Sequence, residues 1–141
     1  MRNLTFIFLF LSVLCSCSNE VSKYEFENYK WKEGSSIVLN FKSEKADKKD
    51  LYLEIRSVYG IPYELIPLDF ILEKPNGEEI QFSKDIKFKG ENLDCAGDLC
   101  DQKVLIMNDL NLDKGDYTLK ISHFNMNSNI YGLMEFRLIK E

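Results

Sequence analysis

Apolar and polar residues alternate along much of this 141-residue chain. The alternation is clearest in residues 51–56, where Leu51, Leu53 and Ile55 fall on one side, and it recurs in residues 117–122. Successive side chains of a β-strand point to opposite faces of its sheet, so the alternation predicts strands with one buried face. Short apolar runs predict further strands, at residues 37–41, 68–72, 80–82, 86–88, 104–107 and 131–139.

Residues that favour tight turns separate these segments. The pair Asn76-Gly77 is the strongest hairpin signal, because both residue types tolerate the positive φ angles of a two-residue turn. Loops are expected at residues 43–50 and 89–101, which are rich in charged and small residues. No stretch of helix length carries apolar residues at a 3.6-residue spacing. The sequence therefore predicts an all-β fold, a single β-sandwich, Ig-like or jelly-roll-like, of seven to eight short antiparallel strands.

The N-terminal segment has a different pattern. Arg2 precedes an apolar run at residues 4–14, about 11 residues long, whereas a helix needs roughly 20 to span a membrane. This arrangement is typical of a secretory signal peptide over residues 1–16. Leu14-Cys15-Ser16 before Cys17 predicts cleavage of the bacterial lipoprotein type, with Cys17 as the lipidated first residue. An ordinary secretory cut beside two incidental cysteines is the alternative.

Removal of that segment leaves enough chain for one domain. We expect a lipidated N-terminus and short tether at residues 17–30, followed by the β-sandwich domain at residues 31–141. The loss of Arg2 lowers the formal net charge from −5 to −6. Nucleic acids reward clustered Lys and Arg, so this balance argues against a nucleic-acid partner. The lipid itself is the expected membrane contact, since buried acyl chains anchor a protein stably.

Cys95 and Cys100 are expected to form a disulfide. Export places them in an oxidising compartment, and Gly97 between them lets the chain fold back on itself. A loop this small stabilises the fold by roughly 2 kcal/mol in the chain-entropy model. A redox site is the weaker alternative, because the C-x-x-C spacing is missing. Zinc is also disfavoured, because it requires two more ligands and His123 is the single histidine.

Other candidate chemistry is sparse. Asp94, Asp98 and Asp101 surround the cysteines, and a solvated acidic loop is the preferred interpretation over a Ca²⁺ site. His123 is expected to be a surface or edge-strand imidazole, because nothing in the sequence pairs it with a nucleophile or a carboxylate. Phosphate loops and hydrolase-type serine motifs are missing. We therefore expect no catalytic residues, no metal, no cofactor and no enzymatic activity.

An aromatic turn at residues 59–63 is a candidate contact surface. Tyr59 and Tyr63 bracket Ile61 and Pro62 where the chain bends, so the rings could present a rigid, amphipathic surface to a partner. Alternatively, both rings fold over the end of the hydrophobic core.

Four stretches follow one another across most of the mature chain: the Cys17 motif with the aromatic residues 24–41, residues 50–56 continuing through Tyr59, Pro62-Tyr63 and residues 68–77, Gly97-Asp98-Leu99 with Val104-Leu105, and Gly115-Asp116-Tyr117-Thr118. Each stretch alone is an ordinary strand pattern, but their succession resembles the gliding-motility lipoprotein family GldH of Bacteroidetes. Two departures are a less glycine-rich segment at Asp94-Cys95-Ala96 and a shorter region after Ser122.

The resemblance implies a cell-envelope lipoprotein needed for surface gliding, a machinery tied to the type IX secretion system. It offers no catalytic residues, and it implies an assembly role among other envelope proteins. The alternative is an envelope β-sandwich module that binds a glycan or another extracellular ligand. Directly after Cys17, Ser18-Asn19-Glu20 holds one acid and not the acidic run that is often associated with surface display in this phylum. We therefore expect an anchor on the periplasmic face of the outer membrane and not on the cell surface.

Overall fold

The computed structural model describes residues 19–123 and 128–141. The expected signal peptide at residues 1–16 and the expected lipidation site Cys17 lie outside these residues. Within the two described ranges, no helix has the length and apolar character required to cross a membrane.

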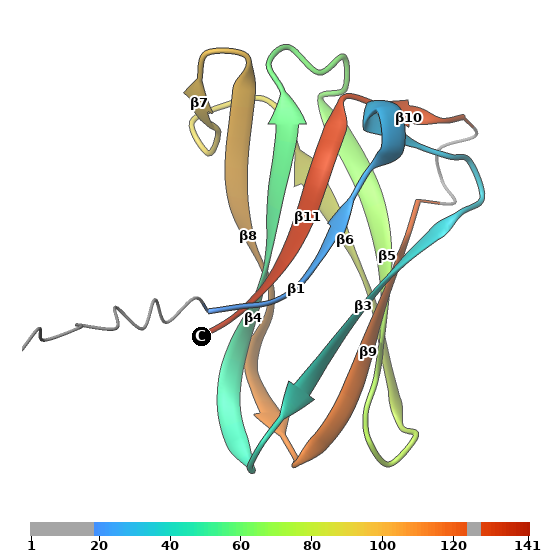
Figure 1. Ribbon diagram of the computed structural model, residues 1–141, viewed down its shortest axis with the longest axis vertical. Coiled ribbons are helices and arrows are strands. Elements are labelled where there is room, and N and C mark those ends of the chain that lie inside the picture. The colour runs from blue at the N-terminus through green and yellow to red at the C-terminus, as the bar shows by residue number, and fades with distance from the viewer. Residues whose placement is uncertain (1–18, 124–127) are drawn as a thin grey trace, which may run out of the picture.

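The described residues form a β-sandwich in which every strand pair is antiparallel (Figure 1). One sheet has the order β1-β11-β4-β8-β7, the other β3-β9-β5-β6, and β10 pairs with β2 at one end. The all-β sandwich expected from the alternating pattern is confirmed. The elements are β1 (Glu20–Glu25), a 3₁₀ turn η1 (Glu27–Tyr29), β2 (Lys30–Trp31), β3 (Ser36–Ser43), β4 (Asp47–Val58), β5 (Leu65–Glu73), β6 (Glu79–Lys87), β7 (Asp94–Ala96), β8 (Leu99–Leu112), β9 (Gly115–Ser122), β10 (Ile130–Tyr131) and β11 (Leu133–Lys140).

The strands are longer than the apolar runs indicated. The segments expected at 80–82 and 86–88 are one strand, β6, while β4 begins inside the expected loop 43–50. β8 likewise begins inside the expected loop 89–101. The polar residues in these extensions, at 47–50 and at Asp101, do not oppose pairing, because each is exposed or half-buried on a strand with one buried face.

The N-terminal boundary also differs from the expectation of a tether over residues 17–30. β1 pairs with β11 from Glu20 onward, and the N–H of Lys140 donates to the carbonyl oxygen of Asn19 (N···O 3.0 Å). Phe26 and Trp31 then pack edge-on against Phe136, with ring centroids 5.0 and 5.6 Å away. β11 would otherwise expose a row of unpaired backbone groups, so the sandwich includes this segment and begins at Glu20.

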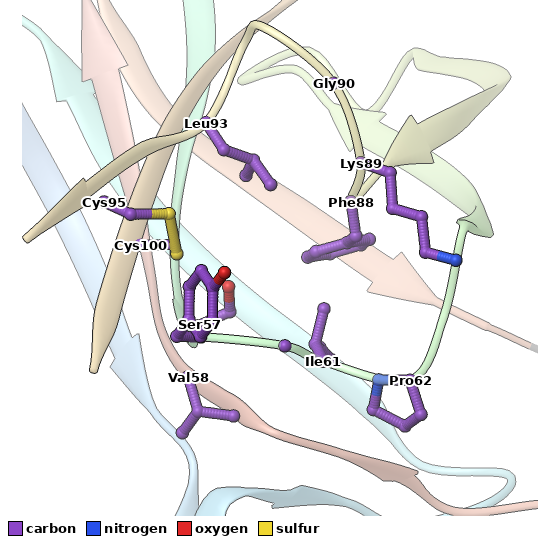
Figure 2. Close-up of a pocket in the computed structure, with 12 residues that line it drawn as sticks. Ser57, Val58, Ile61, Pro62, Phe88, Lys89, Gly90, Leu93, Cys95 and Cys100 are labelled. Atoms are coloured by element: carbon purple, nitrogen blue, oxygen red, sulfur yellow. A yellow bond between two sulfur atoms is a disulfide. The ribbon is translucent and has the colours of Figure 1, made fainter. Parts of the chain in front are cut away.

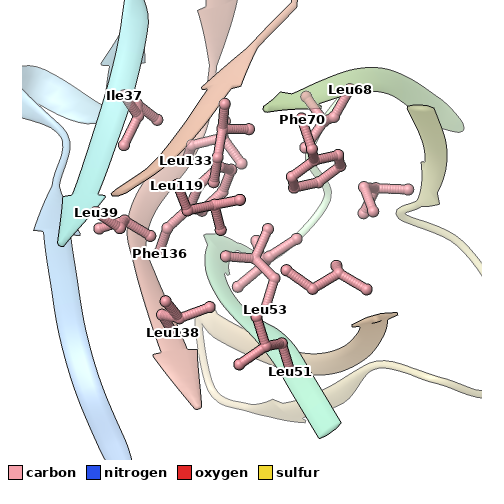
Figure 3. Packing of buried hydrophobic residues seen from close by; sticks show 14 of the residues in the cluster. Ile37, Leu39, Leu51, Leu53, Leu68, Phe70, Leu119, Leu133, Phe136 and Leu138 are labelled. Carbon is pink, nitrogen blue, oxygen red and sulfur yellow. The ribbon is translucent and has the colours of Figure 1, made fainter. Parts of the chain in front are cut away.

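The core lies between the two sheets and follows the alternation in the sequence. Leu51, Leu53 and Ile55 of β4 are fully buried. Figure 3 shows Leu51 and Leu53 in one cluster with Phe70 of β5 and Leu119 of β9, from the other sheet. Burying a side chain of this size stabilises a fold by roughly 1.5–3 kcal/mol. The hydrophobic core therefore holds the two sheets together and fixes the positions of the loops at each end.

Candidate functional site

Two connections meet at one end of the sandwich and enclose a pocket. The turn between β4 and β5 and the segment between β6 and β8 both lie at the end where β7 is found (Figure 1). The pocket has a volume of about 430 Å³. It is lined by Ser57, Val58, Tyr59, Gly60, Ile61, Pro62, Phe88, Lys89, Gly90, Leu93, Cys95 and Cys100.

Backbone hydrogen bonds fasten both walls of this pocket. The N–H of Tyr59 donates to the carbonyl oxygen of Asp98 (N···O 2.8 Å). This bond joins the turn between β4 and β5 to the β7–β8 hairpin. The N–H of Phe88 donates to the carbonyl oxygen of Glu64 (N···O 2.9 Å) and continues the β5–β6 ladder by one pair. These bonds tie the turn at residues 59–63 and the end of β6 to neighbouring strands, so the pocket walls belong to the framework of the sandwich.

The Cys95–Cys100 disulfide forms one wall of the pocket (Figure 2). The two residues oppose each other in the β7–β8 pair, with their Cα atoms 4.0 Å apart. The disulfide expected from the sequence is confirmed. Cys100 is 3% exposed, while Cys95 lies at the surface, so the bridge ties the outermost strand to the core.

The turn at residues 59–63 combines the two roles that its sequence allowed, a contact surface and a cover for the core. Tyr59 is 69% exposed, whereas Ile61 is 6% exposed and points into the pocket beside Phe88 (Figure 2). The Tyr63 ring packs against the core, and its hydroxyl accepts a hydrogen bond from the N–H of Tyr131 (3.1 Å). Tyr59 is therefore available to a partner, and Tyr63 covers the end of the core.

A second hollow adjoins the pocket. It has a volume of about 650 Å³ and shares Pro62 and Lys89 with the first. Lys87 and Leu65 line it as well, together with Tyr63 and Glu64. The sequence did not single out Phe88, Leu93 or the two lysines, because no local pattern indicates that the end of β6 lies beside the turn after β4.

The calcium alternative for Asp94, Asp98 and Asp101 is not supported by the geometry. Asp101 accepts two hydrogen bonds from Arg56, Nε to Oδ1 at 2.8 Å and Nη2 to Oδ2 at 2.9 Å. These bonds hold the pKa of Asp101 below its usual value. Over residues 19–123 and 128–141, no three His, Cys, Asp or Glu side chains are grouped to hold a metal ion. Asp101 instead serves the cross-strand pairing of β4 with β8.

The surface position expected for His123 is wrong. This imidazole is 1% exposed, and its Nε2 lies 3.0 Å from the carbonyl oxygen of Lys32. Its ring packs edge-on against Trp31, with centroids 4.4 Å apart. His123 follows β9, which lies between β3 and β5 in its sheet, so the residue is enclosed by neighbouring strands. It has a packing role away from the pocket.

Comparisons with known proteins add little to this geometry. No family model matches the chain, and no curated protein matches it. Among solved structures, the chain is similar to an exo-beta-1,3-galactanase from Phanerochaete chrysosporium, crystallised with galactose, at 12% sequence identity and a TM-score of 0.34. That likeness covers 84% of this chain and 29% of the galactanase chain. The chain thus spans less than a third of that enzyme's length, and the likeness is too weak to inform on function.

Proposed function

We propose that this chain is a non-enzymatic, membrane-anchored lipoprotein whose pocket end binds another protein of the cell envelope. The observation that carries the proposal is the exposed Tyr59 ring at the edge of a largely apolar pocket. Aromatic side chains beside apolar pockets are common anchors of protein interfaces, because binding a partner buries both. The pocket offers two titratable side chains from the described residues, Tyr59 and Lys89, and no carboxylate for acid–base chemistry.

The machinery we propose is that of gliding motility or the associated type IX secretion system. The succession of motifs from Cys17 to Thr118 resembles the GldH lipoproteins, and the turn at residues 59–63 lies in the longest of those stretches. The role would be assembly, with Tyr59, Ile61 and Pro62 at the contact and Tyr63 supporting the turn from below. The glycan-binding alternative predicts a sugar ligand at the same pocket and no protein partner.

The anchor in this proposal is a lipid on Cys17, on the periplasmic face of the outer membrane. Asn19 is already bonded to the last strand, so three residues, 17–19, separate the lipid from the sandwich. At about 3.3–3.6 Å per residue they reach roughly 10 Å. A partner of this domain would therefore lie close to the membrane surface. Cys17→Ala should leave unprocessed precursor or release the protein, and a mature protein that remained acylated would contradict the anchor.

Photocrosslinking in living cells tests the contact. The full chain would carry p-benzoylphenylalanine in place of Tyr59, which is 69% exposed, and a control would carry it in place of Val38, which is 50% exposed on the other sheet. We expect a discrete crosslinked envelope protein from position 59 only. The same product from both positions, or binding on a glycan array with no protein crosslink, would contradict the proposed function.

Genetic complementation tests the machinery. A deletion strain complemented with the gene for the Tyr59→Ser variant should lack gliding or type IX secretion. The same strain complemented with the Val38→Ser variant should keep both. Normal gliding and normal secretion in the deletion strain itself would exclude this role.

A further inference from the structure

We infer that the pocket and its neighbouring hollow form one groove, and that this groove binds a peptide segment in which an apolar side chain is followed by acidic residues. This inference rests on the proposed function, since it specifies the chemistry of the partner at the same site. Its basis is the pair Lys87 and Lys89, which the proposed function does not use.

The two hollows adjoin at Pro62 and Lys89, which line both. Figure 2 shows Phe88, Leu93 and Ile61 pointing into the first hollow, and the Lys89 side chain at its rim on the side of Pro62. Beyond that rim, the second hollow adds Lys87 and the half-exposed Leu65. The groove thus has an apolar end at the disulfide and a cationic end at the close of β6.

Lys87 ends β6 and Lys89 follows two residues later, and both are exposed and line the second hollow. Among the described residues, no carboxylate lies within ion-pair distance of either ammonium group. Glu64 lines the second hollow with them, so this hollow holds two lysines against one glutamate. In a chain with a formal net charge of −5, this local excess of positive charge is complementary to an anionic ligand.

The shape favours a peptide over an acyl chain or a sugar. Both hollows are open to solvent, with volumes of about 430 and 650 Å³, which suit a few side chains. The apolar and cationic ends meet at Pro62 and Lys89, so neighbouring residues of an extended segment would reach both. A neutral sugar, or an acyl chain without an anionic headgroup, would leave both lysines without a counter-charge.

Fluorescence anisotropy with defined peptides tests the inference. The probe is a fluorescein-labelled peptide with one leucine followed by two aspartates in a glycine–serine background. Two matched peptides replace the aspartates by lysines or the leucine by glycine. The protein is the full lipidated chain in neutral phosphatidylcholine nanodiscs. The variant is Lys87→Glu/Lys89→Glu, and the control is Lys45→Glu/Lys114→Glu, with the same charge change at exposed turns of the opposite end.

We expect the leucine–aspartate peptide to bind best and to bind the Lys87→Glu/Lys89→Glu variant about tenfold more weakly. The control variant should match the wild-type protein, and salt at about 0.5 M should weaken binding, because it screens exposed charges. Equal binding of the aspartate and lysine peptides, or no binding of any peptide, would overturn the inference. Binding confined to phosphatidylglycerol vesicles or to a soluble β-glucan would overturn it too.

These outcomes separate the inference from the proposed function. If the peptides show no charge preference while the crosslink from position 59 persists in cells, only the acidic chemistry of the partner is wrong. If both the peptide binding and the crosslink are missing, the proposed function fails as well.

Discussion

At the scale of single residues, one glycine shows how turns at the end opposite the pocket are packed. Gly115 opens β9 with φ of +141°, and a Cβ built there would lie 2.7 Å from Cβ and Cγ of Pro75. Pro75 belongs to the β5–β6 hairpin that the Asn76-Gly77 pair indicated, where Gly77 has φ of +84° and open space around it. The two turns therefore touch. The close contact leaves no room for a side chain at position 115, whereas position 77 has room for one.

Gly115→Ala should lower the free energy of unfolding by about 1–3 kcal/mol, because it adds a steric clash to a left-handed backbone conformation. Urea denaturation of the purified protein measures this. Gly77→Ala is the matched control, since it carries the backbone strain without the clash and should cost less. An equal loss in the two variants would contradict the packing of Gly115 against Pro75.

The Asp101 carboxylate should make stability depend on pH. Arg56 donates to it and holds its pKa below the usual value, so its favourable contribution is present above the unfolded-state pKa, near 3.9, and is lost as pH falls through the lower folded-state pKa. Arg56→Met should therefore flatten the fall of the urea midpoint below about pH 4. Lys23→Met, which removes the solvent-exposed pair with Glu25, should change that profile less, because water screens that pair. Identical acid profiles in all three proteins would contradict the role of Arg56.

At the scale of elements, β7 depends on a short hairpin. It contributes three register pairs to β8, and its other edge is free of strand pairing in the described structure. The Cys95–Cys100 bridge and the bond from Tyr59 to Asp98 are its remaining ties. The hairpin is therefore a local unit whose order determines the wall of the pocket.

Cys95→Ala/Cys100→Ala should cost about 2 kcal/mol of stability and loosen this unit first. Hydrogen exchange measured by mass spectrometry should show faster exchange in residues 59 and 94–100, while amides of β4 and β11 keep their protection. A uniform loss of protection across the sandwich would show that the bridge supports the whole fold and not the hairpin alone.

At the scale of the whole molecule, the proposed anchor and the pocket lie on different parts of the surface. The start of β1 and the C-terminus lie together near mid-height of the long axis, and the pocket lies at one end of that axis (Figure 1). Two lysines lie close to the start of β1. The N–H of Lys140 donates to the carbonyl oxygen of Asn19, and Lys103 forms an ion pair with the neighbouring Glu141 (2.5 Å). With a reach of roughly 10 Å, the lipid on Cys17 would hold this side against the bilayer.

Lysine acetylation footprinting tests this orientation. On liposomes, the lipidated protein should show lower reactivity at Lys103 and Lys140 than the same protein lacking the lipid, while Lys87 and Lys89 at the pocket end keep theirs. Equal reactivity at all four lysines in both forms would contradict the short tether.

The alternating pattern of strands such as residues 51–56 and the turn signal of Asn76-Gly77 were enough to predict an all-β sandwich and one of its hairpins, because strand period and turn preference are local properties. The Cys95–Cys100 disulfide was predictable for the same reason, since only five positions separate the two cysteines. The expected two-residue turn was wrong: the N–H of Gly77 donates to the carbonyl oxygen of Lys74, so the turn is centred on Pro75 and Asn76, and only Gly77 takes a positive φ. Local sequence also located the turn at residues 59–63, but it did not decide which tyrosine is exposed.

Only the tertiary structure decided the rest. It paired Glu20–Glu25 with the last strand, buried His123, and brought the end of β6 beside the turn after β4. These are contacts between segments far apart in the chain, whose strand order no local pattern specifies. The sequence by itself therefore determined what kind of layers this protein forms, and the packing of those layers decided where its pocket lies and that Lys87 and Lys89 line it.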